Sequence, residues 1–154
     1  MLPAHQIHTY IQPDPLPPEA VELFGHEVEQ AWQGSSDQPP SVCIGVTTDG
    51  QWLAGIWMLL EMVEQPSSPP LHVASIRQLI VSPAARGQGL AGRLLRRAMT
   101  VASSNGCSHI RSTAGFGCID HLTMYHRLGF ERLSGQRPYL VMRKLPTASQ
   151  NAGE

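Results

Sequence analysis

The sequence predicts an α/β fold. The prediction rests on two kinds of segment that occur along the chain. Short segments rich in β-branched residues, typical of strands, alternate with segments whose apolar residues recur at helical spacing. The chain has 154 residues, of which 42% are apolar, so it is long enough for one sizeable core and too short for two. We therefore predict a single domain over residues 1–145, followed by a disordered tail over residues 146–154.

The first half of the chain is predicted to hold three strands and one helix. Residues 7–12 alternate in polarity and form the first strand. A helix follows from Glu19 to about Gly34, with one face formed by Val21, Phe24, Val28 and Trp32. The second and third strands, residues 42–47 and 52–62, form a hairpin, because Thr48-Asp49-Gly50 between them is a strong turn signal.

The second half begins with a predicted strand over residues 73–81. The helix after it, which ends at Gly106, places Leu90, Leu94, Leu95, Ala98, Val101 and Ala102 toward the core and three arginines toward water. The remaining elements are a strand at 109–113, a helix at 119–128 ended by Gly129, and strands at about 130–133 and 139–145. The predicted order is β-α-β-β-β-α-β-α-β-β.

Charge is unevenly distributed along the chain, although the net charge is only −1. So small a net charge gives no electrostatic bias toward nucleic acid or membrane, and we expect neither as a partner. Every Arg and Lys lies at position 77 or later, whereas most acidic residues lie in the first 64. We therefore expect positive potential on the second half.

Cellular location is predicted from the same composition. No charged-then-apolar leader and no run of 18 apolar residues occurs, so neither secretion nor membrane insertion is expected. The three cysteines, Cys43, Cys107 and Cys118, are odd in number and scattered. Free thiols in a reducing, cytoplasmic setting are the favoured interpretation.

The most informative segment is residues 79–92. An apolar run ends at Pro83, a basic, glycine-rich loop follows, and a helix begins at once. Backbone N–H groups in the first helical turn lack partners within the helix, and the helix dipole adds positive potential there. Glycines let the main chain approach a ligand closely, and Arg86 supplies a full charge. The segment is therefore suited to bind a phosphate or pyrophosphate.

Neither of two common nucleotide-binding motifs fits this loop well. Gly87, Gly89 and Gly92 spell the dinucleotide fingerprint G-x-G-x-x-G, but five residues separate them from the strand and the acidic residue expected about 20 positions later is missing. We therefore disfavour the dinucleotide interpretation. No Gly-Lys-Ser/Thr occurs, which excludes a P-loop.

Three motifs in the right order resemble the GNAT superfamily of N-acetyltransferases. Arg86-Gly87-Gln88-Gly89-Leu90-Ala91 matches the family's pyrophosphate loop, and Leu79, Val81 and Pro83 match the run before it. Tyr125-His126-Arg127-Leu128-Gly129-Phe130 and the closing strand at 140–145 are also similar to the family. The resemblance covers residues 71–145. It implies a mixed, mostly antiparallel sheet with helices on both faces.

The resemblance also implies an enzyme that transfers an acetyl group from acetyl-CoA to a primary amine by direct attack in a ternary complex. The cofactor's pantetheine arm would lie along Leu79, Ile80 and Val81, where a backbone N–H of Ile80 or Val81 would bind the oxyanion. The pyrophosphate would lie on the main chain of residues 86–91, extended to Gly92. Acetyl-CoA would act as co-substrate, with no metal.

Tyr125 occupies the place of the family's usual general acid. A phenol with a pKa near 10 stays protonated until a departing thiolate needs its proton. The alternative role is an aromatic side chain that packs beside Leu122 and Leu128.

The general base is where the sequence departs from the family. Family members carry Glu or His at two positions that are Ser75 and Arg77 here, neither of which is a good base. Glu61 and His72 are candidate substitutes. Otherwise water relays the proton, or the amine binds in its neutral form. Arg77 could bind an acidic group of the substrate or be a solvated strand residue.

Cys118 stands where the family often places an asparagine that contacts the cofactor, so its contact there is a weaker expectation. The histidine pairs lack a third ligand, so we predict no metal site. A homodimer is left open, and the acceptor amine is not predicted. Because no base is evident, the alternative function is a non-catalytic acyl-CoA-binding or sensor module.

Overall fold

A computed structural model describes residues 5–34, 37–114, 119–133 and 139–146 of the chain. The predicted tail beyond residue 146 and Cys118 lie outside these described residues. The chain divides into two compact units. One unit comprises residues 1–59 and 77–98, and the other comprises residues 60–76 and 99–154.

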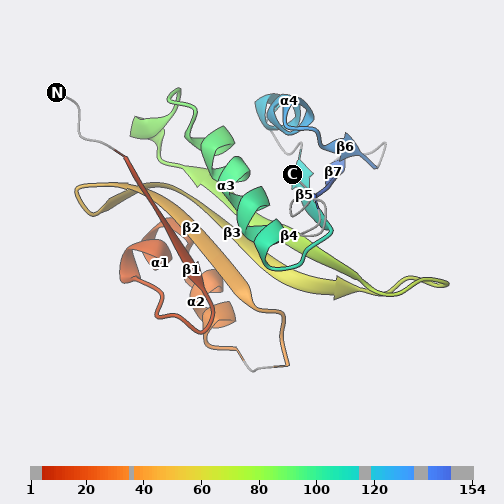
Figure 1. The fold of residues 1–154 in the computed structure, drawn as a ribbon. Helices are drawn as coiled ribbons and strands as arrows, with labels where there is room; N and C mark the ends of the chain where they lie inside the picture. Colours follow the sequence, from red (N-terminus) through yellow and green to blue (C-terminus); the bar gives the residue numbers. More distant parts are fainter. Residues whose placement is uncertain (1–4, 35–36, 115–118, 134–138, 147–154) are drawn as a thin grey trace. The chain divides into compact units, whose positions relative to one another are not determined.

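The strands form one mixed sheet with the hydrogen-bonded order β1-β2-β3-β4-β5-β7-β6 (Figure 1). The strands are β1 (Gln6–Ile11), β2 (Ser41–Thr48), β3 (Gln51–Val63), β4 (Leu71–Val81), β5 (His109–Ala114), β6 (Glu131–Arg132) and β7 (Tyr139–Lys144). β4 and β5 pair in parallel, whereas β1–β2, β2–β3, β5–β7 and β6–β7 pair antiparallel. The predicted mixed, mostly antiparallel sheet is confirmed.

The hairpin between β2 and β3 confirms the turn predicted at Thr48-Asp49-Gly50. Asp49 has φ 52° and Gly50 has φ 79°. Positive φ at both central residues is what a type I′ turn requires, and its twist matches that of the flanking strands. The turn therefore sets the register in which Thr48 pairs with Gln51.

The single helix predicted over residues 19–34 is wrong in one respect. Two helices occupy this segment, α1 (Pro18–Phe24) and α2 (His26–Trp32), and Gly25 between them has φ 95°. That backbone conformation is incompatible with a continuous α-helix and favours glycine. The predicted apolar face is retained across the break, because Phe24 and Val28 are both buried.

α1 and α2 pack on one face of β2 and β3. Their buried residues Ala20, Phe24 and Val28 form a cluster with Cys43 and Trp57. Each large apolar side chain buried in this way contributes roughly 1.5–3 kcal/mol to stability. Close approach is possible because the strand residue under the Phe24 ring is Gly55, where an added Cβ would lie 2.6 Å from the Phe24 Cζ atom.

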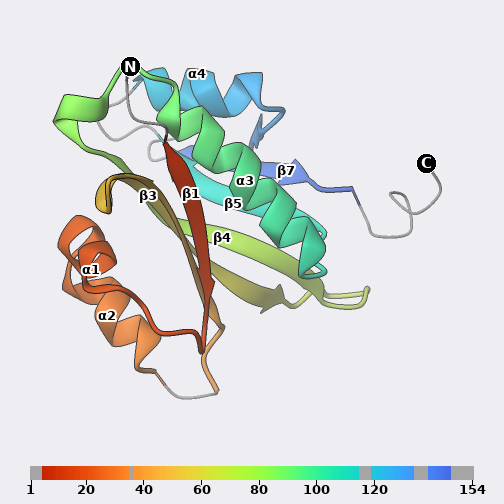
Figure 2. The same cartoon turned by 60° about the vertical axis from the view of Figure 1, so that its left-hand side comes forward.

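The opposite face of these strands is covered by the start of α3 (Leu90–Ser104), as the two views of the ribbon show (Figures 1 and 2). Leu90, Leu94, Leu95 and Ala98 are buried, and Arg93, Arg96 and Arg97 are exposed. This is the division that the helical spacing predicts.

The second unit is built on β5, which pairs with β7 along its whole length, and on α4 (Ile119–Arg127). Ile110, Phe130 and Val141 are among its fully buried side chains. α4 ends before Gly129, whose φ of 87° confirms the predicted C-terminal stop. β6 is shorter than the strand predicted at about 130–133. In the described residues its ladder to β7 contains Glu131 and Arg132, and the Leu133 N–H adds a hydrogen bond to the Leu140 carbonyl.

Candidate functional site

The glycine-rich loop that links β4 to α3 lies in the first unit. A short 3₁₀ helix over Pro83–Ala85, which the sequence did not predict, precedes it. Gly87 has φ 83° and Gly89 has φ 74°, and a Cβ at either position would have no heavy atom within 4 Å. Glycine is therefore needed here for its left-handed backbone rather than for lack of space. Residues 86–89 are exposed, so their backbone is accessible to a ligand.

The start of α3 adds hydrogen-bond donors to this loop. The Arg93 N–H donates to the Gly89 carbonyl at 3.2 Å, which makes Gly89 the residue that precedes the helix. The N–H groups of Leu90, Ala91 and Gly92 therefore come before the first intrahelical bond and have no partner four residues back. No acidic residue occurs between residues 65 and 119. Loop and helix together are therefore suited to bind an anion.

Two hydrogen bonds hold the C-terminal end of β4 where it meets the glycine-rich loop. The Ser82 N–H donates to the Leu53 carbonyl at 2.8 Å, and Arg86 Nε donates to the Val81 carbonyl at 3.3 Å. Ile80 packs against the cluster that contains Trp57. The three predicted pantetheine-binding residues, 79–81, thus belong to a strand end that is held in place.

Pairing of β4 with its parallel neighbour is short. Within the described chain, the ladder to β5 consists of three residue pairs, from Val73–His109 to Ser75–Arg111. β4 itself continues to Val81. In the part of the chain that the structure describes, the backbone groups on this edge beyond Ser75 take no part in the β5 ladder, so they are candidates to bind an extended ligand.

Sequence reasoning missed one residue of the loop's surroundings, His5. Its Nε2 lies 3.0 Å from Oε1 of Gln88, and its Nδ1 lies 2.7 Å from Oγ1 of Thr48. A histidine 83 residues away in the chain has no spacing relationship to the loop, so no sequence pattern could have found this contact.

Tyr125 lies in the second unit, on α4, and is buried with 3% of its surface exposed. Its hydroxyl lies 2.9 Å from the hydroxyl of Ser112 on β5, and its ring meets the ring of Phe130 edge-on at 5.1 Å. Burial raises the pKa of Tyr125 above its usual value, and the Ser112 hydrogen bond partly opposes this effect. The phenol therefore stays protonated at neutral pH.

Glu61 belongs to a polar cluster with Ser75 and Arg111. The Ser75 hydroxyl donates to Glu61 Oε2 at 2.5 Å, and Arg111 Nη2 donates to the same oxygen at 2.9 Å. Arg111 Nε also donates to the Ser75 hydroxyl oxygen at 2.7 Å. The Glu61 and Arg111 side chains are 25% and 31% exposed, so the ion pair is partly open to solvent. The carboxylate is held in a defined orientation.

The Glu61 cluster and the Tyr125 hydroxyl lie on opposite faces of β5. Arg111 and Ser112 are consecutive residues of this strand, so their side chains point to opposite faces. Arg111 binds Glu61, and Ser112 contacts Tyr125. Glu61 could therefore serve as base and Tyr125 as acid only if the reacting groups can be reached from both faces of β5.

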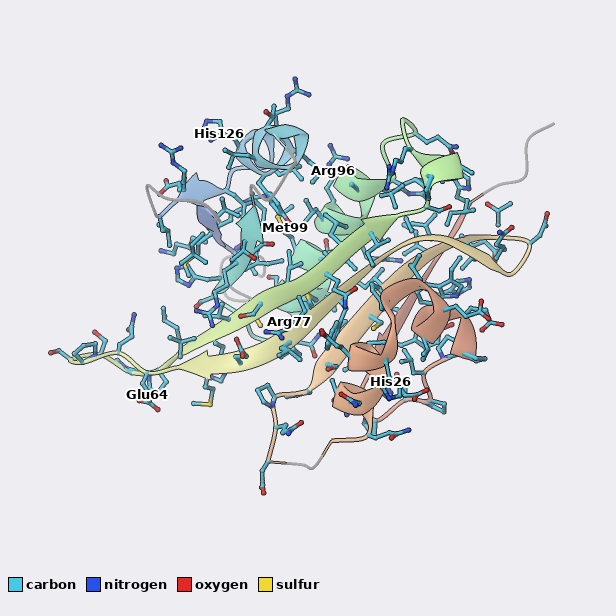
Figure 3. All side chains as sticks on the ribbon, turned by 180° about the vertical axis from the view of Figure 1, so that it is seen from behind. His26, Glu64, Arg77, Arg96, Met99 and His126 are labelled. Atoms are coloured by element: carbon cyan, nitrogen blue, oxygen red, sulfur yellow. The ribbon has the colours of Figure 1, made fainter. Side chains whose placement is uncertain are left out.

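The other candidate residues are less constrained. His72 is exposed at the start of β4, and its carbonyl accepts the Ser108 N–H at 2.8 Å. Arg77 is exposed with its guanidinium 5.9 Å from the ring centre of Trp57, a cation–π contact. Figure 3 shows Arg77 on the side of the strands that α1 and α2 cover, whereas Arg96 projects from α3 on the other side.

The described cysteines are buried thiols. Cys43 and Cys107 are buried free thiols, and burial raises the pKa of Cys43 to about 12 and that of Cys107 above its usual value. Over the described ranges, no three His, Cys, Asp or Glu side chains gather to hold a metal ion. In the same ranges, no helix has the length and apolar character needed to cross a membrane.

Comparison with known proteins identifies the fold and the family. The sequence model of the acetyltransferase (GNAT) family matches residues 4–130. A search among proteins of curated function gives no significant sequence match. Solved structures, in contrast, do match this fold.

A GNAT family N-acetyltransferase, YhbS, from Escherichia coli in complex with CoA superposes with a TM-score of 0.66 at 18% identity, over 95% of this chain and 85% of that one. The ribosomal-protein-S18-alanine N-acetyltransferase of Escherichia coli superposes with a TM-score of 0.65 at 17% identity, over 93% of this chain and 94% of that one. The IAA acetyltransferase of Bacillus cereus superposes with a TM-score of 0.63 at 15% identity, over 91% of this chain and 100% of that one. At these identities the likeness is one of fold. With the family match over most of its length, the chain belongs to the acetyltransferase (GNAT) family and is an acyltransferase.

Proposed function

We propose that the protein transfers an acetyl group from acetyl-CoA to a primary amine by direct attack within a ternary complex. The observation that carries the proposal is the loop at the start of α3. It combines two left-handed glycines, the first N–H groups of a helix, which lack an intrahelical partner, and an arginine-rich segment without acidic residues. This combination suits a pyrophosphate. A protein of the same fold has been solved with CoA bound.

The cofactor would bind to main-chain groups. The backbone of residues 86–92 would bind the pyrophosphate, and Arg86 would add a positive charge. The pantetheine arm would run along residues 79–81 and use the β4 groups that the β5 ladder leaves unused. A backbone N–H of Ile80 or Val81 would stabilise the oxyanion that forms when the amine attacks the thioester carbonyl.

Tyr125 would act as general acid. As the carbon–sulfur bond breaks, its hydroxyl would give a proton to the departing CoA thiolate. The raised pKa of this buried phenol supports the role, because the hydroxyl remains protonated across the neutral range. The hydrogen bond to Ser112 gives the hydroxyl a defined direction.

The amine must lose a proton, and two residues are proposed to accept it. Glu61 is an oriented carboxylate on a strand that neighbours β4. His72 is an exposed imidazole on β4 itself. Glu61 is favoured by its fixed geometry, and the comparison of variants described in the Discussion distinguishes the two.

A turnover screen tests the proposed function. The protein is incubated with acetyl-CoA and a panel of amines, polyamines, amino acids and peptides, and both the released thiol and the acetylated product are measured. We expect an acetylated amine whose formation requires the protein. Binding of acetyl-CoA without an acetylated product on any amine would instead indicate the non-catalytic acyl-CoA-binding module.

A further inference from the structure

His5 bridges two segments of the first unit that are far apart in the sequence. One segment is the glycine-rich loop that links β4 to α3, which His5 contacts through Gln88. The other is the end of β2, which it reaches through Thr48. The ribbon shows the N-terminal end of β1 beside the start of α3 (Figure 2). The bridge therefore joins a loop to an ordered strand end.

Both ring nitrogens of His5 have a hydrogen-bond partner. An amide oxygen only accepts hydrogen bonds, so Nε2 donates to Gln88 Oε1. Nδ1 pairs with the Thr48 hydroxyl, which can donate or accept. Both ring nitrogens are used, so the ring is held in one orientation.

The loop has particular need of such a contact. Gln88 stands between Gly87 and Gly89, two residues without side chains in the left-handed conformation. Glycine has more backbone freedom to lose than any other residue, so ordering this loop around a ligand is entropically unfavourable. A loop that is ordered before the ligand arrives binds it more tightly.

We infer that His5 is a positioning residue for the pyrophosphate loop. By holding the Gln88 side chain it fixes the loop conformation in which the backbone binds the cofactor's pyrophosphate. The inference rests on the proposed function in one respect only, namely that the loop binds coenzyme A. In this proposal His5 acts through Gln88 and not by direct contact with the cofactor.

The experiment measures dissociation constants for coenzyme A and for pantetheine, which lacks the pyrophosphate, in the wild type and in His5→Ala. We expect His5→Ala to weaken coenzyme A binding about fivefold, the effect of one net hydrogen bond. Pantetheine binding should be unchanged, because pantetheine lacks the pyrophosphate that is proposed to lie on the loop. Equal weakening of both ligands would show a general structural effect and would overturn the inference.

Matched variants separate the bridge from other effects. His8→Ala removes an exposed histidine of the same strand that takes no part in the bridge, and it should leave coenzyme A binding unchanged. Gln88→Ala and Thr48→Val each remove one hydrogen-bond partner of His5. They replace His5→Ala in the experiment if that variant does not fold. The double variant His5→Ala/Gln88→Ala should bind coenzyme A no more weakly than the weaker single variant, because both remove one interaction.

Two kinds of failure can be told apart. If the wild type does not bind coenzyme A, the proposed function is wrong. If the wild type binds it and His5→Ala, Gln88→Ala and Thr48→Val all bind it equally well, the loop is bound without help from His5 and only the present inference is wrong.

Discussion

The Tyr125 and Ser112 hydroxyls lie 2.9 Å apart, both buried, one on α4 and the other on β5. Burial makes the phenol a weak acid that keeps its proton, and the serine gives it an orientation. Glu61 lies on the other face of β5. If both residues act, the proton that leaves the amine and the proton that reaches the thiolate are handled by different groups.

Tyr125→Phe should lower kcat by about 10²–10⁴-fold, the loss that follows removal of a positioned acid. Acetyl-CoA affinity should change little, because the ring and its edge contact with Phe130 are retained. The measurement is steady-state turnover alongside a binding titration. A variant that turns over within about threefold of the wild type would show that Tyr125 only packs, and that the thiolate leaves with help from water.

Ser112→Ala should move the alkaline limb of the kcat–pH profile to higher pH. The Ser112 hydrogen bond lowers the pKa of Tyr125, so its removal raises that pKa further above the ordinary value of 10. The protonated form of a required acid disappears as the pH rises through its pKa. The alkaline limb should therefore lie at higher pH in the variant than in the wild type. The tyrosinate absorbance, corrected with Tyr125→Phe, should shift in the same direction. A limb that moves to lower pH would contradict the assignment.

Glu61→Gln and His72→Gln compare the two candidate bases under equal conditions. If Glu61 accepts the amine proton, Glu61→Gln should lower kcat by about 10²-fold or more, while His72→Gln stays near the wild type. Stability should fall by less than about 1 kcal/mol, because the ion pair with Arg111 is partly exposed. Retained turnover in both variants would favour a water relay.

Gly89→Asp should weaken coenzyme A binding by about tenfold or more, since it places a side chain and a negative charge where the pyrophosphate would lie. Some loss of stability is expected from the φ of 74°. Gly106→Asp is the matched control, because Gly106 also has positive φ and open space around it but stands at the far end of α3. Equal binding by the two folded variants would argue against the loop as the cofactor site.

Local patterns were enough to predict most of the fold. The apolar spacing of α3, the Asp-Gly turn and the glycine after α4 each act within a few residues, and each is found as expected. The break at Gly25 was missed because one glycine within a helical pattern is usually tolerated. Its left-handed φ becomes evident only once α1 and α2 are packed on β2 and β3.

The candidate site divides in the same way. The loop at residues 86–92 is contiguous, so its chemistry can be inferred from the sequence alone. Contacts that join residues far apart in the sequence cannot be inferred in this way. The ion pair of Glu61 with Arg111 spans 50 residues, and the Tyr125–Ser112 pair depends on how α4 packs on β5. Such partners are set by tertiary packing and carry no spacing pattern.

Direct titration of the wild-type protein with coenzyme A and, in parallel, with NAD is the measurement that tests the central claim most directly. We expect saturable coenzyme A binding in the calorimeter and a raised melting temperature, because a ligand that binds only the folded state stabilises it. NAD at the same concentration should do neither. Saturable binding of NAD without binding of coenzyme A would contradict the assignment and would favour the dinucleotide interpretation of the glycine loop.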